Sequence, residues 1–108
     1  MIDKKLIGLM KPTAYFVNTA RAATVSDEDI VSALREHRIA GGAFDVFNTE
    51  PLPLDSPYLT LDNVVLTPHL CGASLAVVKN HSRMVAEDVA LFSAGKRPVR
   101  LVNKEVLP

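Results

Sequence analysis

The sequence predicts an α/β fold in which a short parallel sheet is combined with helices. Three compact apolar runs have the length of buried strands, and other segments carry helix-start signals or helical periodicity. These segments follow one another as helix, strand, helix, strand, strand and helix, an order typical of a parallel sheet with helical connections. Since three strands are few and parallel sheets are covered on both faces, we expect one side of the sheet to have an apolar edge that needs a neighbour.

The N-terminal half contains a short helix, a strand and a second helix. Residues 6–10 have the apolar pattern of the last turns of a helix, which must end before Pro12. Residues 14–17 form the first predicted strand. The second helix begins at Ser26, whose side chain can cap backbone N–H groups, and acidic residues follow where the helix dipole is positive. This helix should end near residues 37–38, and its inner face is supplied by Ile30, Val31, Ala33 and Leu34.

The C-terminal half contains two strands, a long helix and a tail. Residues 39–47 and 63–67 are predicted strands, and residues 49–57 form a loop with three prolines. This loop is a poor crossover helix, so the sequence leaves the strand order open there. The longest helix is predicted from about residue 74 to 94, before Gly95, with a stripe formed by Val78, Val85, Val89 and Phe92.

Residues 96–108 are predicted to form an extended tail. Apolar side chains recur along it, which indicates that the tail packs against another surface. These apolar residues are Val99, Leu101, Val102, Val106 and Leu107.

The composition is that of one small globular domain of 108 residues. Twelve basic and twelve acidic residues cancel, which argues against a nucleic acid or an anionic membrane as a partner. The single cysteine, Cys71, excludes an internal disulfide and suits a reducing compartment. No apolar run approaches the ~20 residues that span a bilayer, and the first eleven residues lack the pattern of a secretory signal. We therefore expect a cytoplasmic protein.

Three residues of complementary chemistry, Arg21, Glu50 and His69, each follow a predicted strand. Because ligands bind beyond the carboxyl ends of parallel strands, we expect the three side chains to converge at one edge of the sheet. An arginine guanidinium can bind a carboxylate in a bidentate manner, through two parallel hydrogen bonds. An imidazole exchanges protons near neutrality, and a carboxylate on its N–H fixes the tautomer and favours the protonated ring. The trio therefore predicts binding of an acid together with proton transfer.

Each of these residues also has a simpler interpretation. Arg21 could be a surface residue or pair with an acid of the next helix, His69 could be a hydrogen-bonded loop residue, and Glu50 could be solvated. Asp45 ends its strand, where its carboxylate could accept from a ligand amide or cap the following turn. His69 and Cys71 lack further ligands at suitable spacing, so no metal site is expected.

The glycines exclude one kind of site. The five glycines of the chain never form G-x-G-x-x-G, so the sequence contains no pyrophosphate-binding loop of that type. If a dinucleotide binds, this chain contributes only the nicotinamide end of its site.

The order and spacing of these motifs resemble the C-terminal part of the D-isomer-specific 2-hydroxyacid dehydrogenases, a family that includes phosphoglycerate, glyoxylate/hydroxypyruvate and D-lactate dehydrogenases. The resemblance implies a partial Rossmann-like three-layer sandwich, with residues 1–95 as the C-terminal half of the NAD(P)-binding domain. Residues 96–108 would be a tail that returns to the substrate domain. The resemblance covers nearly the whole chain and is carried by residues 10–14, 17–21, 39–47, 50–53, 63–69 and 98–106.

The resemblance implies hydride transfer between NAD or NADP and a small 2-oxo or 2-hydroxy acid. Arg21 would bind the substrate carboxylate and carbonyl, His69 would be the proton donor or acceptor, and Glu50 would be the partner of His69. Asp45 would meet the nicotinamide carboxamide. The cofactor pocket would be lined by Thr19, Ala20, Arg21, Asp45, His69 and Gly72.

The sequence departs from the family pattern in two ways. Ala22 and the Ala23-Thr24 pair stand where the family commonly has glycine and a Gly/Leu-type pair, which requires an unstrained backbone at Ala22. The glycine-rich loop and most of the substrate domain are also absent from the sequence. We therefore expect the isolated chain to be inactive, and the full-length enzyme to be a homodimer. The alternative is a non-catalytic relative that senses a dinucleotide or binds a partner; the particular acid, and the choice between NAD and NADP, stay open.

Overall fold

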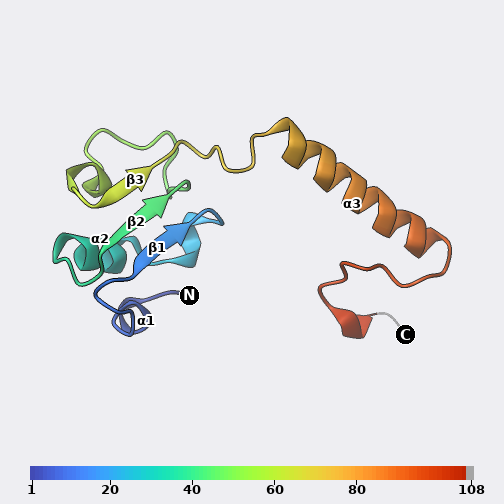
Figure 1. Cartoon of the computed structure of the whole chain (residues 1–108), viewed down its shortest axis with the longest axis horizontal. Coiled ribbons are helices and arrows are strands. Elements are labelled where there is room, and N and C mark those ends of the chain that lie inside the picture. Colours follow the sequence, from blue (N-terminus) through green and yellow to red (C-terminus); the bar gives the residue numbers. More distant parts are fainter. Residues whose placement is uncertain (107–108) are drawn as a thin grey trace. The chain divides into compact units, whose positions relative to one another are not determined.

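The computed structural model describes residues 1–106 and divides the chain into two compact units, Met1–Cys71 and Gly72–Pro108 (Figure 1). The first unit contains the sheet with α1 and α2, and the second contains the long helix α3. The helices and strands in chain order are α1 (Lys4–Ile7), β1 (Tyr15–Asn18), α2 (Asp27–Arg35), β2 (Gly41–Phe44), β3 (Val64–Leu66) and α3 (Leu75–Ser93).

The sheet has the order β1-β2-β3, and both neighbouring pairs are parallel. Val17 pairs with Ala43, and Ala43 pairs with Val65, so these three residues form one row across the sheet. The link from β2 to β3 contains only the short 3₁₀ helix η2 (Pro57–Thr60). The predicted α/β class with a short parallel sheet is confirmed, and the strand order is now assigned.

Some elements are shorter than the sequence predicts, and others are shifted. β1 begins at Tyr15 and extends to Asn18, one residue later than predicted, and β2 uses only four of the nine residues expected. α1 ends at Ile7 rather than reaching Met10. The reason is a change in hydrogen bonding: the Met10 N–H donates to the carbonyl three residues back, on Ile7, so the helix gives way to tight turns.

The core of the first unit lies between α2 and one face of the sheet. Ser26 caps α2 by accepting from the Asp29 N–H, as predicted. Phe44 of β2 stacks on Phe16 with ring centroids 5.9 Å apart and contacts Tyr58 at 4.9 Å. The predicted inner face of α2 is confirmed, because its buried residues are Ile30, Val31, Ala33 and Leu34.

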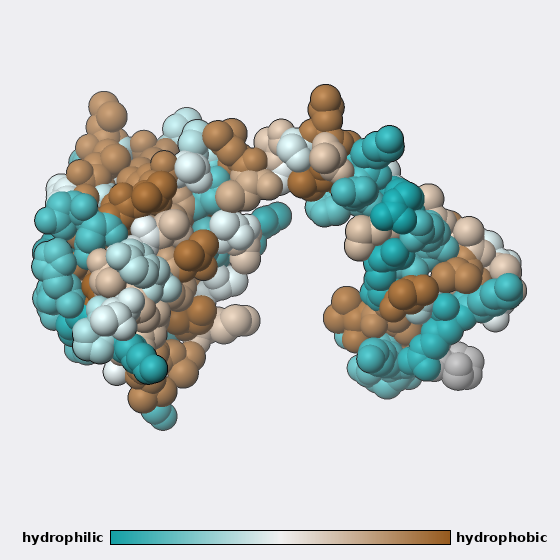
Figure 2. All heavy atoms as spheres, viewed as in Figure 1, coloured by the Kyte–Doolittle hydropathy of each residue, from teal (hydrophilic) through white to brown (hydrophobic). Residues whose placement is uncertain are grey.

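The opposite face of the sheet is open within the first unit. Tyr15, Val17 and Val65 alternate with the core residues along their strands, and they are 72%, 64% and 64% exposed. Figure 2 shows hydrophobic side chains at the surface of this unit. The sequence predicted an apolar edge on one side of the sheet, and the exposed apolar side chains of β1 and β3 lie on one face of it.

The second unit is built on α3, which confirms the predicted longest helix. Ser74 caps its start by accepting from the Val77 N–H at 3.2 Å, and Gly95 follows its end with φ +69°. The predicted apolar stripe is more than half exposed in this unit: Val78, Val85, Val89 and Phe92. Among the described residues, no helix has the length and apolar character needed to cross a membrane.

The tail contacts α3 mainly through polar groups. Arg100 donates to the Glu87 carboxylate at 2.8 Å and to the Met84 carbonyl at 3.2 Å. The hydrogen bonds that Glu87 accepts from Arg100 and Arg83 lower its pKa. A short 3₁₀ helix, η3 (Lys104–Val106), follows. Among the apolar tail residues, Val99, Val102 and Val106 are largely exposed, and Leu107 lies outside the described residues.

Candidate active site

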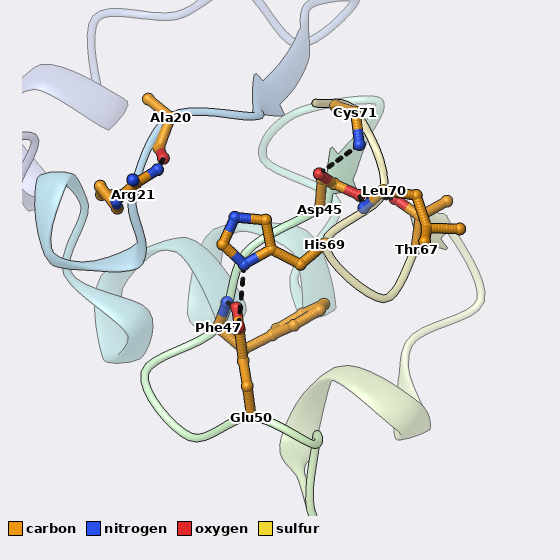
Figure 3. Close-up of polar contacts among 9 residues, drawn as sticks. All are labelled: Ala20, Arg21, Asp45, Phe47, Glu50, Thr67, His69, Leu70 and Cys71. Atoms are coloured by element: carbon orange, nitrogen blue, oxygen red, sulfur yellow. Dashed lines mark hydrogen bonds and ion pairs between the residues drawn. The ribbon is translucent and has the colours of Figure 1, made fainter. Parts of the chain in front are cut away.

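The sequence-predicted site residues of the first unit lie just beyond the carboxyl ends of the three strands. Arg21 follows β1, Asp45 and Glu50 follow β2, and His69 follows β3 (Figure 3). Two backbone hydrogen bonds continue the ladder past the strands: the Asp45 N–H donates to the Asn18 carbonyl and the Thr67 N–H to the Phe44 carbonyl, both at 3.0 Å. Ligand sites in open parallel sheets occur at this edge.

Glu50 and His69 are brought into direct contact. His69 Nδ1 lies 2.9 Å from Glu50 Oε2, and the other carboxylate oxygen accepts from the Phe47 N–H at 2.9 Å. The hydrogen bond from His69 and that from Phe47 lower the pKa of Glu50, which favours the ionised carboxylate. An ionised carboxylate only accepts hydrogen bonds, so Nδ1 carries a hydrogen and Nε2 is the atom left for proton exchange.

The pair is placed where a ligand can reach it. The His69 side chain is 46% exposed and the Glu50 side chain 37% exposed. A cavity of about 530 Å³ lies beside them. Its wall is mostly apolar, with Phe47, Pro51, Leu52, Leu59, Leu66 and Pro68 among the lining residues.

Asp45 is buried behind the turn that carries His69. Its Oδ1 accepts from the Thr67 hydroxyl at 2.5 Å and from the Leu70 N–H at 2.8 Å, and its Oδ2 accepts from the Cys71 N–H at 2.9 Å. The residue is 2% exposed. The Thr67 hydrogen bond, more than any other contact, holds the pKa of Asp45 far below its ordinary value. Burial acts in the opposite direction, and the hydrogen bonds from the Leu70 and Cys71 N–H groups lower the pKa further.

His69 itself adopts a backbone conformation that side chains rarely take. Its φ is +55°, in the left-handed region, and its N–H donates to the Thr67 carbonyl at 3.0 Å. Such a conformation persists only where the surroundings hold it. The sequence gives no signal for this conformation, because glycine is the residue that usually indicates a positive φ and this position is a histidine.

Arg21 is exposed but does not join the Glu50–His69 pair. Its Nη1 donates to the Ala20 carbonyl at 2.7 Å, and no hydrogen bond or ion pair links it to Glu50 or His69 within residues 1–106. The preceding loop is ordered by Asn18, whose side chain accepts from the Ala20 N–H and donates to the Arg21 carbonyl. Thr19 and Ala20 are exposed in this loop.

Ala22, where the resemblance led us to expect glycine, does not have a positive φ. Ala22 begins the short 3₁₀ helix η1 (Ala22–Thr24), and the side chain of Thr24 holds this turn by donating to the Arg21 carbonyl at 2.6 Å. The non-glycine residues with positive φ in residues 1–106 are His37 and His69. The unstrained backbone required at Ala22 is therefore present.

Gly72 and the other candidate ligands fall outside this arrangement. Gly72 is the first residue of the second unit, whereas the site above is built from residues of the first unit. Cys71 is exposed, and its contact with Asp45 raises the pKa of the thiol. Over residues 1–106, no cluster of three His, Cys, Asp or Glu side chains could hold a metal ion.

The sequence reasoning missed the groups that fix this site. The hydroxyl of Thr67 is visible in the sequence next to Pro68 and His69, so a hydrogen-bonding role could have been considered there. The N–H groups of Leu70 and Cys71 leave no sequence signal, because almost every residue has one.

Comparison with known proteins gives a consistent picture. The protein-family model described as "D-isomer specific 2-hydroxyacid dehydrogenase, NAD binding domain" matches residues 1–71 of the chain. Glyoxylate reductases from Thermofilum pendens and Korarchaeum cryptofilum are 43% and 44% identical to the chain over 107 residues, which is 99% of the chain and 32% of each relative. The chain thus spans about a third of the length of these curated relatives.

Solved structures of similar fold carry related names. A probable 2-hydroxyacid dehydrogenase from Rhizobium etli, in complex with NADP, HEPES and L(+)-tartaric acid, has a TM-score of 0.74 and 30% identity, covering 99% of this chain and 35% of its own. A D-isomer specific 2-hydroxyacid dehydrogenase from Xanthobacter autotrophicus, in complex with NADPH and MES, has a TM-score of 0.72 and 32% identity, with coverage of 97% and 43%.

Proposed function

Because the chain belongs to the D-isomer specific 2-hydroxyacid dehydrogenase family, we propose that it carries the proton-transfer and acid-binding groups of an NAD(P)-dependent oxidoreductase. The substrate class is a small 2-oxo or 2-hydroxy acid, in line with the names of the glyoxylate reductases that it matches. The observation that carries the proposal is the contact between His69 Nδ1 and the Glu50 carboxylate.

His69 is the proposed proton donor and acceptor. With Nδ1–H held by Glu50, Nε2 can give a proton to the carbonyl oxygen of a 2-oxo acid, or take it back from the hydroxyl of a 2-hydroxy acid. In the protonated ring that exists before donation, the Glu50 carboxylate holds Nδ1–H and leaves Nε2–H for the substrate. The exposed ring and the adjoining cavity leave room for a small ligand.

Arg21 is the proposed substrate-binding residue. Its guanidinium has five N–H donors, and the contact with the Ala20 carbonyl uses one nitrogen. The remaining donors suit the two oxygens of a carboxylate. Its positive charge would also offset the negative charge that develops on the substrate carbonyl oxygen.

The residues present fit the nicotinamide end of a dinucleotide. The exposed loop of Thr19 and Ala20 and the His69 turn lie at the carboxyl ends of parallel strands, where such ligands bind. Asp45 is the proposed acceptor for a carboxamide NH₂, because its pKa lies far below the ordinary value and an ionised carboxylate only accepts hydrogen bonds. When bound, NAD(P)H would supply the hydride that reduces the substrate carbon.

We further propose that residues 1–95 form the C-terminal half of the nucleotide domain and that residues 96–108 return toward a substrate domain. The proposal predicts negligible turnover by the 108 residues alone, since no glycine-rich loop in the sequence offers a place for the pyrophosphate. Glyoxylate-dependent oxidation of NADH or NADPH by the purified chain would contradict this part of the proposal.

A chimera tests the proposed activity. Residues of this chain would replace the aligned 107-residue segment of the Thermofilum pendens glyoxylate reductase, and glyoxylate reduction would be followed by NADH or NADPH absorbance. We expect turnover, a loss of kcat of about 10²–10⁴-fold in His69→Gln, and a raised KM for glyoxylate in Arg21→Gln. Cofactor affinity, measured by fluorescence quenching, should stay unchanged in His69→Gln.

Two outcomes would contradict the proposed function. One is a chimera that folds and binds NADPH but does not reduce 2-oxo acids, while the parent reductase does. The other is a His69→Gln chimera that retains its rate, which would show that His69 is not the proton donor or acceptor. The first outcome would favour a dinucleotide-sensing or partner-binding role. The matched control is His81→Gln, which changes a histidine of α3 outside the proposed site.

A further inference from the structure

The turn that carries His69 is held on both sides by one buried carboxylate. Asp45 accepts from Thr67, two residues before the histidine, and from Leu70 and Cys71, immediately after it. His69 itself makes no hydrogen bond to Asp45 within residues 1–106. Asp45 therefore acts on the histidine through the backbone that surrounds it (Figure 3).

The conformation that Asp45 holds is one that the chain would not adopt unaided. His69 lies at φ +55°, and a side chain at positive φ is disfavoured by contacts with its own backbone. Three hydrogen bonds to an ionised acceptor are of the strong, charge-assisted kind. They flank the strained residue closely enough to keep its backbone in place.

The same stretch of chain fixes both the backbone and the ring of the histidine. Asp45 follows β2 directly and holds the turn, and Glu50, five residues later, holds Nδ1 of the imidazole. Glu50 is in turn fixed by the Phe47 N–H at 2.9 Å. The ring therefore meets Glu50 from a turn whose flanking groups are bonded to Asp45.

We propose that Asp45 is a positioning residue for His69, in addition to any contact that it makes with a cofactor. This deepens the proposed function and rests on it for its catalytic meaning. The use of three acceptor positions inside the protein, and an exposure of only 2%, favour this role over one confined to ligand binding. An asparagine cannot replace it, because its NH₂ would face the Cys71 N–H in one orientation and the Leu70 N–H in the other.

The test is made by NMR on the 108-residue chain, without cofactor or substrate. The ring ¹⁵N signals of His69, identified by their loss in His69→Gln, report which nitrogen carries the hydrogen. In the wild type we expect Nδ1–H to be favoured at neutral pH by about tenfold or more, as for a charge-assisted hydrogen bond. In Asp45→Asn this preference should fall to that of an unconstrained side chain, and in Thr67→Val it should fall partly.

The control is Asp27→Asn, which removes another carboxylate with two side-chain partners. Asp27 accepts from the Tyr58 hydroxyl at 2.8 Å and from Asn48 at 2.7 Å, so this variant should lose stability without changing the His69 signals. Amide spectra show which variants are folded. If Asp45→Asn does not fold, Thr67→Val decides: a partial loss of the preference supports the proposal, and an unchanged preference overturns it.

A folded Asp45→Asn chain with the wild-type His69 signals would also overturn the proposal, as would an equal change in Asp27→Asn. These readouts need no turnover. An inactive chimera with the expected NMR result would therefore refute the proposed function and leave the positioning role of Asp45 intact. An active chimera with unchanged NMR signals in Asp45→Asn would support the proposed function and refute the positioning role of Asp45.

Discussion

Replacing Glu50 with glutamine tests the proposed pairing most directly. The carboxylate accepts from the Phe47 N–H on one oxygen and from His69 Nδ1 on the other, both at 2.9 Å. If the glutamine oxygen stays on Phe47, its NH₂ meets Nδ1, and the imidazole hydrogen must move to Nε2. If the oxygen instead meets Nδ1, the NH₂ opposes the Phe47 N–H. The first arrangement reverses the hydrogen bond and the tautomer of His69, and the second breaks the contact with Phe47.

The size of the effect follows from which groups remain. General acid–base catalysis contributes about 10²–10⁴-fold, and Glu50→Gln keeps the imidazole while removing its charge partner and its tautomer control. We expect kcat of the glyoxylate reductase chimera to fall by about 10- to 10³-fold, with less effect on the KM for NADPH. The His69 hydrogen bond lowers the pKa of Glu50, so the wild-type carboxylate stays ionised below pH 4.5, the ordinary pKa of a glutamate. The difference in kcat between the wild type and Glu50→Gln should therefore persist below pH 4.5.

Steady-state reduction of glyoxylate, measured across pH, checks this expectation. Asp55→Asn is the matched control, because Asp55 lies in the same proline-rich loop as Glu50. Its carboxylate makes no hydrogen bond or ion pair in the described part of the chain. If Glu50→Gln stays within about twofold of wild type while His69→Gln is inactive, the pairing has no catalytic role. The reasoning from the 2.9 Å contact would then be wrong.

Three further predictions concern stability, measured by urea unfolding of the 108-residue chain. Leu34→Ala removes a side chain with 0% exposure and should lower the free energy of unfolding by about 2–5 kcal/mol; a loss below about 1 kcal/mol would show that the site is poorly packed. Tyr58→Phe deletes the hydroxyl that donates to Asp27 at 2.8 Å and should cost about 1.5–3 kcal/mol; an unchanged midpoint would contradict this. Because the native pKa of Asp45 is depressed, its stabilisation is full above its ordinary value of 3.8 and is lost as the pH falls through the native pKa. Asp45→Asn should therefore be less stable than wild type at neutral pH, and the difference should shrink in strong acid.

The fold could be predicted wherever its signals are local. Ser26 and Ser74 each cap the helix that they were expected to begin, and Gly95 follows the end of α3 with the positive φ that favours glycine. The strand order could not be predicted, because the link from β2 to β3 has no regular helix to mark a crossover. Pairing of distant strands depends on contacts that no short segment contains.

The candidate site could be predicted only in part for a related reason. Glu50 and His69 were recognised by their chemistry and by their places after predicted strands, and the structure brings them into contact. The contacts of Asp45 could not be foreseen, since two of its three donors are backbone N–H groups. Arg21 was expected to converge with the pair, but its side chain donates to the carbonyl of Ala20. This contact is local, because Ala20 is the preceding residue.

The position of the site depends on the register of the sheet. The Asp45 N–H is bonded to the Asn18 carbonyl and the Thr67 N–H to the Phe44 carbonyl, so the three strand ends are tied together one residue beyond the sheet. In a strand, neighbouring side chains point to opposite faces, and a slip of one residue in β2 would turn Asp45 away from Thr67. The core opposes that slip, because the same shift would move Phe44 from the buried face to the open one. Burial of Phe44 therefore helps to place the carboxylate that holds the His69 turn, although the two side chains lie on different faces of the strand.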